Sequence, residues 1–166
     1  MIFWFNLPYS KNEFGARWTT KKEITEIYNS VQNLKVGNRL PKIEFVDTSY
    51  KPLDVNSIIN KPTVLFFWTS HAESHFAASH RKVTELQAKY PEYEFIAINV
   101  NDNDANWKNA LKKYNFEGIK ELHAVDFETI RKQWVITKIH RIIILNADGT
   151  IKNGFANLFD VNFYAT

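Results

Sequence analysis

The segment Thr63–Phe76 reads TVLFFWTSHAESHF and gives the clearest indication of the fold class. Its first six residues form a continuous apolar run of strand length, which is typical of a strand covered on both faces. From Ala72 onward apolar residues recur at helical spacing until Pro91, so the pattern predicts a helix over residues 72–89. A buried strand that leads directly into a helix is a common place for a functional site in α/β proteins.

Strand and helix patterns alternate on either side of this segment. Short apolar runs predict further buried strands, and periodic segments predict helices. The turn residues Asn146–Gly149 predict a hairpin that leads into an edge strand, TIKNGF. The expected strands cover residues 42–47, 94–100 and 139–145, and the expected helices cover residues 106–114 and 127–134. This order predicts an α/β fold of three layers, with a mixed central sheet flanked by helices.

An additional helix is expected near the N-terminus, at about residues 20–34. Thr20 and Glu23 have the spacing of a capping box, in which each side chain accepts a hydrogen bond from the other residue's backbone. The aromatic residues that precede this helix have no basic segment beside them. Such a start is typical of a fragment of a longer protein rather than of a signal peptide.

Length and composition exclude several classes of function. The chain has 166 residues and is 45% hydrophobic, so it can form one domain with a substantial core. Its formal charge is only +3, and its lysines alternate with acidic residues, so we expect no nucleic-acid partner. No apolar run is long enough to predict a membrane span.

The absence of cysteine from all 166 residues is the most informative count. It excludes disulfides, thiolate nucleophiles, iron–sulfur clusters and cysteine-rich zinc sites. Thiol–disulfide exchange begins with the attack of a thiolate on a sulfur atom. Thiol–disulfide oxidoreductase activity is therefore excluded by composition alone.

Four motifs, in order, resemble those of the TlpA/ResA type of thioredoxin-fold proteins, the thiol–disulfide reductases of the bacterial envelope. They are VGNRLPKIEFVD (36–47), KPTVLFFWTS (61–70), EFIAINVNDND (94–104) and IIILNADGTI (142–151). The resemblance implies a thioredoxin-like domain over residues 36–166. It leaves residues 1–35, with the helix near 20–34, as an N-terminal extension.

The resemblance also implies where the family's functional residues would lie. Ala72 falls at the attacking cysteine, His75 falls at the resolving cysteine, and His140 falls at the cis-proline. His71 takes the place of the tryptophan before the dithiol motif, and Glu73 lies between the two former cysteine positions. The scaffold of a redox site is thus expected without its dithiol.

Two functions fit this altered site. The first is a non-catalytic binding or structural module without a cofactor, whose protein or peptide partner is unknown. Family resemblance places such a module in the periplasm or cell envelope, and the cytoplasm is the alternative. The second function is divalent-metal binding, with zinc as the example, through His71, His75 and His140 and with Glu73 as a fourth ligand. Histidines with purely structural roles are the simplest alternative to a metal site.

The remaining polar residues have simpler interpretations. Thr69 or Ser70 is expected to cap the helix that follows, and Asp104 is expected to cap the next one. His80 stands beside Arg81 and Lys82, so it is expected to be solvated. His123 is expected in a loop near the edge of the site. Three tryptophans are expected in the core, namely Trp68, Trp107 and Trp134.

Overall fold

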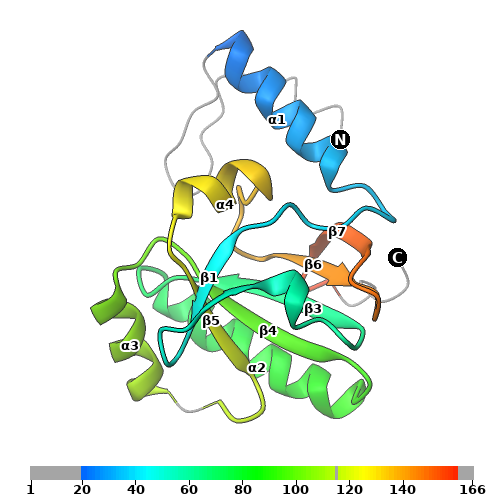
Figure 1. Cartoon of the computed structure of the whole chain (residues 1–166). Coiled ribbons are helices and arrows are strands. Elements are labelled where there is room, and N and C mark those ends of the chain that lie inside the picture. The colour runs from blue at the N-terminus through cyan, green and yellow to red at the C-terminus, as the bar shows by residue number, and fades with distance from the viewer. Residues whose placement is uncertain (1–19, 115, 161–166) are drawn as a thin grey trace.

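The computed structural model describes residues 20–114 and 116–160, and one mixed sheet organises them (Figure 1). The seven strands lie in the order β2-β1-β5-β4-β3-β6-β7. The elements, in chain order, are α1 (Lys21–Asn33), β1 (Glu44–Asp47), β2 (Pro52–Asp54), a 3₁₀ turn (Val55–Ser57), β3 (Thr63–Trp68), α2 (Glu73–Lys89), β4 (Glu94–Asn99), α3 (Asp104–Lys113), β5 (Lys120–Ala124), α4 (Phe127–Gln133), β6 (Arg141–Leu145) and β7 (Ile151–Asn157). The expected α/β fold with an additional N-terminal helix is confirmed.

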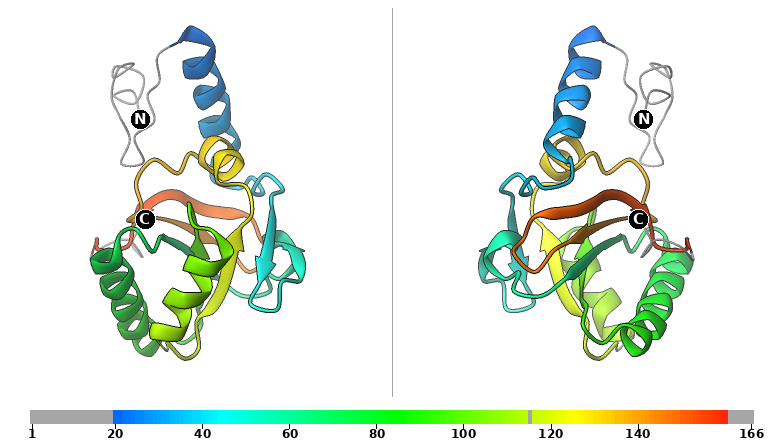
Figure 2. Two further views of the ribbon diagram at one scale, coloured as in Figure 1. Left: turned by 90° about the vertical axis from the view of Figure 1, so that its left-hand side faces the viewer. Right: turned by 90° about the vertical axis from the view of Figure 1, so that its right-hand side faces the viewer.

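The sheet separates two helical layers (Figure 2). Alternate residues of β3 face opposite sides, because successive side chains of a strand point to opposite faces of the sheet. Leu65 and Phe67 pack in the core that α1 and α4 cover. Phe66 and Trp68 pack in the core that α2 and α3 cover. All six residues of β3 are buried, as the apolar run predicts.

Helix α1 begins as its sequence predicts. The Thr20 hydroxyl accepts a hydrogen bond from the Glu23 amide, and the Glu23 carboxylate accepts one from the Thr20 amide. Ile27 and Val31 then pack in the same core as α4. Residues 1–19 lie outside the described part of the chain, so the division into residues 1–35 and 36–166 stays a prediction.

Strands β3, β4 and β5 run parallel, so their carboxyl ends meet at one edge of the sheet. We call the segments that follow these ends, residues 69–72, 100–103 and 125–126, the strand-end face. Trp68, Asn99 and His123 lie side by side in the last aligned row of the three strands. This register determines which side chains can meet at the site.

Two strands were not expected from the sequence. β2 has only three residues, which is too short to show a period of two. β5 begins with Lys120 and Glu121, whose charged side chains are uncommon in strands, and it lies in a segment expected to be a loop. β5 nevertheless pairs with β4 on one side and with β1 on the other.

The outer edge of β7 is partly occupied by other parts of the same chain. The Ile151 amide donates to the Asn38 carbonyl, and the Gly37 amide donates to the Ile151 carbonyl. Farther along, the Asn153 side chain accepts a hydrogen bond from the Phe155 amide at 2.9 Å. Backbone groups of this edge strand are therefore bonded within the molecule.

Candidate functional site

The turn between β3 and α2 ends at Ala72, and His75 lies in the first turn of α2; the sequence resemblance predicts these two residues at the former dithiol positions. The Ala72 amide donates to the Thr69 carbonyl at 3.2 Å, and the His71 amide donates to the Thr69 hydroxyl at 3.3 Å. Ala72 itself is the N-cap residue of α2, and this helix start has no side-chain cap. The expectation that Thr69 or Ser70 caps α2 is therefore wrong, because Ser70 bonds to a different segment.

That segment contains Asp102, whose side chain is fully buried. Its carboxylate accepts hydrogen bonds from the Ser70 amide at 2.7 Å, from the Ser70 hydroxyl, and from the Asn99 side chain at 2.6 Å. The exposed His71 ring lies 3.4 Å from the same carboxylate. One buried acid thus joins the turn after β3 to the turn after β4.

The same network reaches His123 on β5. The Asn99 side-chain nitrogen donates to Asp102, so its oxygen is free to accept a hydrogen bond from the His123 Nδ1–H at 2.8 Å. The His123 ring stacks on Trp107 with 4.8 Å between ring centroids. Burial lowers the pKa of His123, and the charges of Asp104 and Asp102 oppose this shift. His123 lies in strand β5, so the expectation that it lies in a loop is wrong.

Helix α3 begins two residues earlier than expected. The Asn103 side chain accepts a hydrogen bond from the Asn106 amide at 2.8 Å, so Asn103 is the N-cap and Asp104 is the first helical residue. The expectation that Asp104 caps this helix is wrong by one position. Asp104 still favours the helix, since a negative charge in the first turn interacts well with the helix dipole.

His80 is fully buried, which contradicts the expectation that it is solvated. Its Nδ1 lies 2.9 Å from the Phe76 carbonyl, and its Nε2 lies 2.8 Å from the Glu121 carboxylate. The second Glu121 oxygen accepts a hydrogen bond from the Trp68 indole at 3.0 Å. The basic neighbours of His80 predict a solvated side chain, but its spacing from Phe76 and Val83 places it on the buried face of α2.

His75 and His140 form a second group of histidines. Both ring nitrogens of His75 are buried and have no hydrogen-bond partner. Burial is the main cause that lowers the pKa of His75 to about 4, with smaller contributions from the charges of His140 and His80. Burial and the charge of Lys138 lower the pKa of His140. Both imidazoles are therefore neutral at pH 7.

The other two predicted metal ligands have different partners. Glu73 accepts hydrogen bonds from the Lys113 ammonium group and from the Tyr114 hydroxyl, and both contacts lower its pKa. His71 points to Asp102. Within residues 20–114 and 116–160, no group of three or more His, Cys, Asp or Glu side chains is arranged to hold a metal ion. Among the predicted ligands, His140 is near enough to His75 for its charge to contribute to the lowered pKa of His75.

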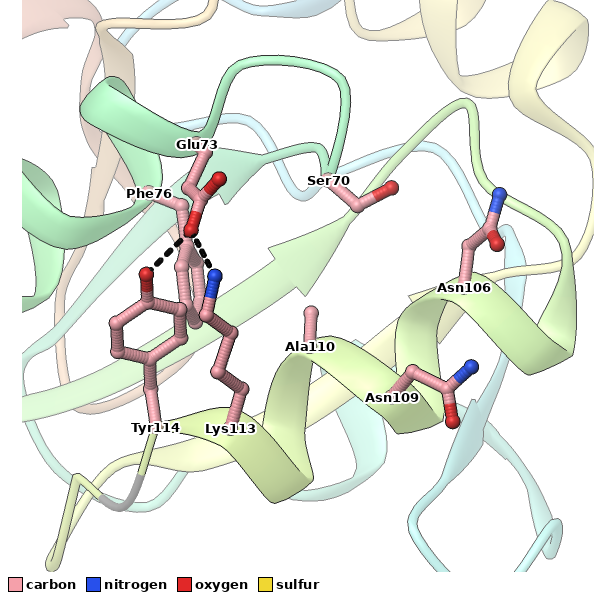
Figure 3. A pocket seen from close by; sticks show the side chains of 8 residues that line it. All are labelled: Ser70, Glu73, Phe76, Asn106, Asn109, Ala110, Lys113 and Tyr114. Atoms are coloured by element: carbon pink, nitrogen blue, oxygen red, sulfur yellow. Dashed lines mark hydrogen bonds and ion pairs between the residues drawn. The ribbon is translucent and has the colours of Figure 1, made fainter.

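A cleft of about 250 Å³ opens between the start of α2 and one face of α3 (Figure 3). Glu73 reaches across from α2 to the Lys113 and Tyr114 side chains on the opposite wall. Sequence reasoning did not find this cleft, since its two walls come from segments that are 30 or more positions apart in the chain. Its lining residues are Ser70, Glu73, Phe76, Asn106, Asn109, Ala110, Lys113 and Tyr114.

The sequence profile of the thioredoxin-like family matches residues 60–151, which is more than half of the chain. The chain belongs to the thioredoxin-like family. The matched region contains the turn after β3 and the hairpin between β6 and β7, two of the segments that carry the sequence resemblance. No curated protein sequence matches this thioredoxin-like chain.

Solved structures support the thioredoxin-like fold. A protein described as a thiol–disulfide oxidoreductase from Bacteroides vulgatus has a TM-score of 0.69 at 18% identity, over 80% of this chain and 94% of that one. A protein described as a thiol:disulfide interchange protein DsbE from Chlorobium tepidum has a TM-score of 0.65 at 15% identity, over 80% and 92%. A secreted disulfide oxidoreductase of Mycobacterium tuberculosis has a TM-score of 0.54 at 23% identity, over 69% and 82%. Identities this low establish the fold alone.

This thioredoxin-like chain has no helix, within its described residues, of the length and apolar character that a membrane crossing requires. The finding agrees with the absence of a long apolar run in the sequence. No cis peptide bond occurs in the described residues, so the backbone at His140 is trans.

His75 is expected to make the thioredoxin-like domain sensitive to acid. In the unfolded chain His75 binds a proton near pH 6.5, whereas in the folded protein it does so only near pH 4. Acidification through this window therefore favours the unfolded state. The full shift corresponds to about 3 kcal/mol, and partial exposure of the ring reduces the expected loss to about 1–2 kcal/mol.

Urea unfolding of the wild type and of His75→Leu at pH 7, 5.5 and 4.5 tests this expectation. The wild type should lose more stability than the variant as the pH falls. The other histidines are present in both proteins, so their contributions cancel in the comparison. Equal losses in the two proteins would contradict the assignment of the acid sensitivity to His75.

Proposed function

We propose that this protein is a redox-inactive thioredoxin-like domain that acts as a binding module for a protein or peptide partner in the bacterial cell envelope. The main support for the proposal is that the cysteines of a redox site are absent, whereas the turns at the strand ends are held together by hydrogen bonds. The chain has no cysteine, and the motif resemblance puts Ala72 and His75 at the former dithiol positions, yet Asp102 holds the turn after β3 against the turn after β4. A strand-end face with this much internal bonding is preorganised for binding.

Two observations support the envelope as the location. The motif resemblance is to envelope reductases, and one solved structure of the same fold is a secreted protein. The location is tested by fractionating cells that express the full-length protein at its native level. Recovery with the periplasmic or membrane fraction is expected, and recovery with the cytoplasm would overturn this part of the proposal.

The binding role is tested by photo-crosslinking in the native cell. A photoreactive amino acid at Ser74, which is exposed at the start of α2 beside the strand-end face, is expected to capture a partner protein. The matched control carries the same group at Glu85, which is exposed near the other end of the same helix. Capture from both positions, or from neither, would contradict a specific interaction at the strand-end face.

Metal binding is a second candidate function, and it is favoured by one observation. The two ring nitrogens of His75 have no hydrogen-bond partner, and neutral imidazole is the form that binds zinc or other divalent ions. His140 would be the second ligand. His71 and Glu73 could join them only by leaving Asp102 and Lys113.

Elemental analysis and melting curves of the tag-free protein test the metal site. A metal-binding domain should contain near-stoichiometric metal, or its melting temperature should rise by several degrees with zinc at about 100 times its dissociation constant. Replacement of His140 by alanine should abolish the rise. A protein without metal, whose melting temperature is the same with and without zinc, would exclude this function.

A further inference from the structure

The imidazole of His75 differs from the other shielded histidines of the domain. Both of its ring nitrogens are buried, and neither has a hydrogen-bond partner in residues 20–114 and 116–160. Buried polar groups in folded proteins are nearly always paired, because an unpaired one costs free energy. Both nitrogens of His80 have partners, and His123 is bonded to Asn99. The unpaired nitrogens of His75 therefore call for a separate explanation.

A turn at the end of β7 brings an aromatic ring against His75. This turn covers residues 157–160 and is closed by a backbone hydrogen bond between its first and last residues. The Phe159 ring meets the His75 ring in a T-shaped arrangement, with centroids 6.1 Å apart and an angle of 83° between the planes. Phe159 is 43% exposed, so this contact lies at the surface of the molecule.

The chain is held firmly up to Leu158 and less firmly beyond it. The Leu158 amide donates to the His140 carbonyl at 3.0 Å, and the Leu158 side chain is buried in the core that α2 covers. The Phe159 amide donates only to the side chain of Asn157, at 2.9 Å. The Phe159 ring can therefore move away from His75 by side-chain rotation, without the loss of any hydrogen bond in the sheet.

The ring that Phe159 contacts is able to bind a ligand. Burial lowers the pKa of His75 to about 4, so at pH 7 the ring is neutral, with one N–H donor and one nitrogen that carries an unshared electron pair. His140 is near enough for its charge to act on His75, and burial lowers the pKa of His140 as well. Uncovering His75 would thus present a donor and an acceptor beside a second imidazole.

We propose that Phe159 is a lid over the altered dithiol site, which closes the nitrogens of His75 off from solvent and exposes them when its ring rotates away. Opening costs little, because Phe159 is already partly exposed and gives up only part of its burial. The unpaired nitrogens gain hydrogen bonds when the lid opens, which offsets some of this cost. The inference rests on the proposed function, since a partner or metal ion is what the open site receives.

Reaction with diethyl pyrocarbonate at pH 7 tests the lid. A neutral imidazole nitrogen attacks the reagent and becomes carbethoxylated, with release of ethanol and carbon dioxide, so the rate reports access to that nitrogen. Mass spectrometry gives the rate at His75 in the wild type and in two variants. Phe159→Ala removes the lid and should raise the rate about fivefold or more. Phe159→Tyr keeps the ring and should leave the rate unchanged.

Two other histidines of the same protein serve as internal controls. The His71 side chain is 61% exposed and should react at one rate in all three proteins. His80 is fully buried, so it should stay unlabelled while the domain is folded. In the wild type, His75 should react several-fold more slowly than His71, and this comparison needs no variant.

Two results would overturn the lid. One is equal rates at His75 in the wild type and in Phe159→Ala, with His80 unlabelled in both. The other is a wild-type rate at His75 as fast as that at His71. Neither measurement requires a partner or a metal ion. Failure of the lid would therefore leave the crosslinking and elemental analyses to decide the proposed function separately.

Discussion

Replacement of Glu121 by alanine is expected to lower the free energy of unfolding by about 2–5 kcal/mol, because each buried group left without its hydrogen-bond partner costs about 1–3 kcal/mol. Glu121 is almost buried, and its carboxylate serves two groups that are fully buried, the His80 imidazole and the Trp68 indole. Alanine leaves both of these nitrogens without a partner. Equilibrium urea unfolding at pH 7 measures the effect.

The partners of the His80 ring determine where its protons lie. The Phe76 carbonyl can only accept, so His80 Nδ1 must carry a proton. The short contact between His80 Nε2 and Glu121 then requires one further proton, held by the imidazole or by the carboxyl group. The rings of Phe76 and Phe116, with centroids 4.3 and 4.7 Å from that of His80, exclude water from the pair.

Glu121→Gln is the matched control for this prediction. The glutamine oxygen can accept from the Trp68 indole, while its amide donates to Nε2 of a neutral His80. Both hydrogen bonds are retained, so the free energy of unfolding of this variant should fall by only about 0.5–1.5 kcal/mol. Equal losses for the alanine and glutamine variants would show that the pair contributes little and that the interpretation of His80 is wrong.

Replacement of Asp102 by alanine is expected to lower the free energy of unfolding by about 2–4 kcal/mol, because three donors lose their acceptor. These donors are the Ser70 amide, the Ser70 hydroxyl and the Asn99 side chain. The Asp102 side chain is fully buried, so water cannot replace the lost carboxylate without rearrangement of the turn. The turn after β3 should also become mobile, and amide hydrogen exchange at Ser70 should accelerate.

Asp104→Ala provides the comparison, because Asp104 is a neighbouring but largely exposed carboxylate. The Asp104→Ala replacement should lower the free energy of unfolding by only about 0.5–1 kcal/mol, which is typical of a surface charge at a helix start. Urea unfolding of both variants distinguishes the two acids. A loss for Asp102→Ala as small as that for Asp104→Ala would contradict the structural role of the buried network.

Local sequence patterns predicted the parts of the fold whose signal lies within one segment. The apolar runs of β3 and β6 and the capping box of α1 each involve neighbouring residues, and each is present in the structure. β5 was missed because its first two residues are charged. One of them, Glu121, forms the buried pair with His80, so the same long-range contact explains two errors.

The candidate site was predictable only in part, for a similar reason. The resemblance to the TlpA/ResA type placed Ala72 and His75 at the former dithiol positions because those motifs are contiguous. The contact of Ser70 with Asp102 joins residues 32 positions apart, and that of Glu73 with Lys113 joins residues 40 positions apart. Only the packing of α2 and α3 against the sheet brings these pairs together.

The bonding along the outer edge of β7 has a consequence for association between molecules. An edge strand with free backbone groups is a template on which another chain can extend the sheet, which leads to strand exchange and aggregation. In β7 the Ile151 amide is already bonded to Asn38, and the Phe155 amide is bonded to Asn153. A partner that adds a strand at this edge would first have to displace these bonds, so contact through side chains and loops elsewhere is favoured.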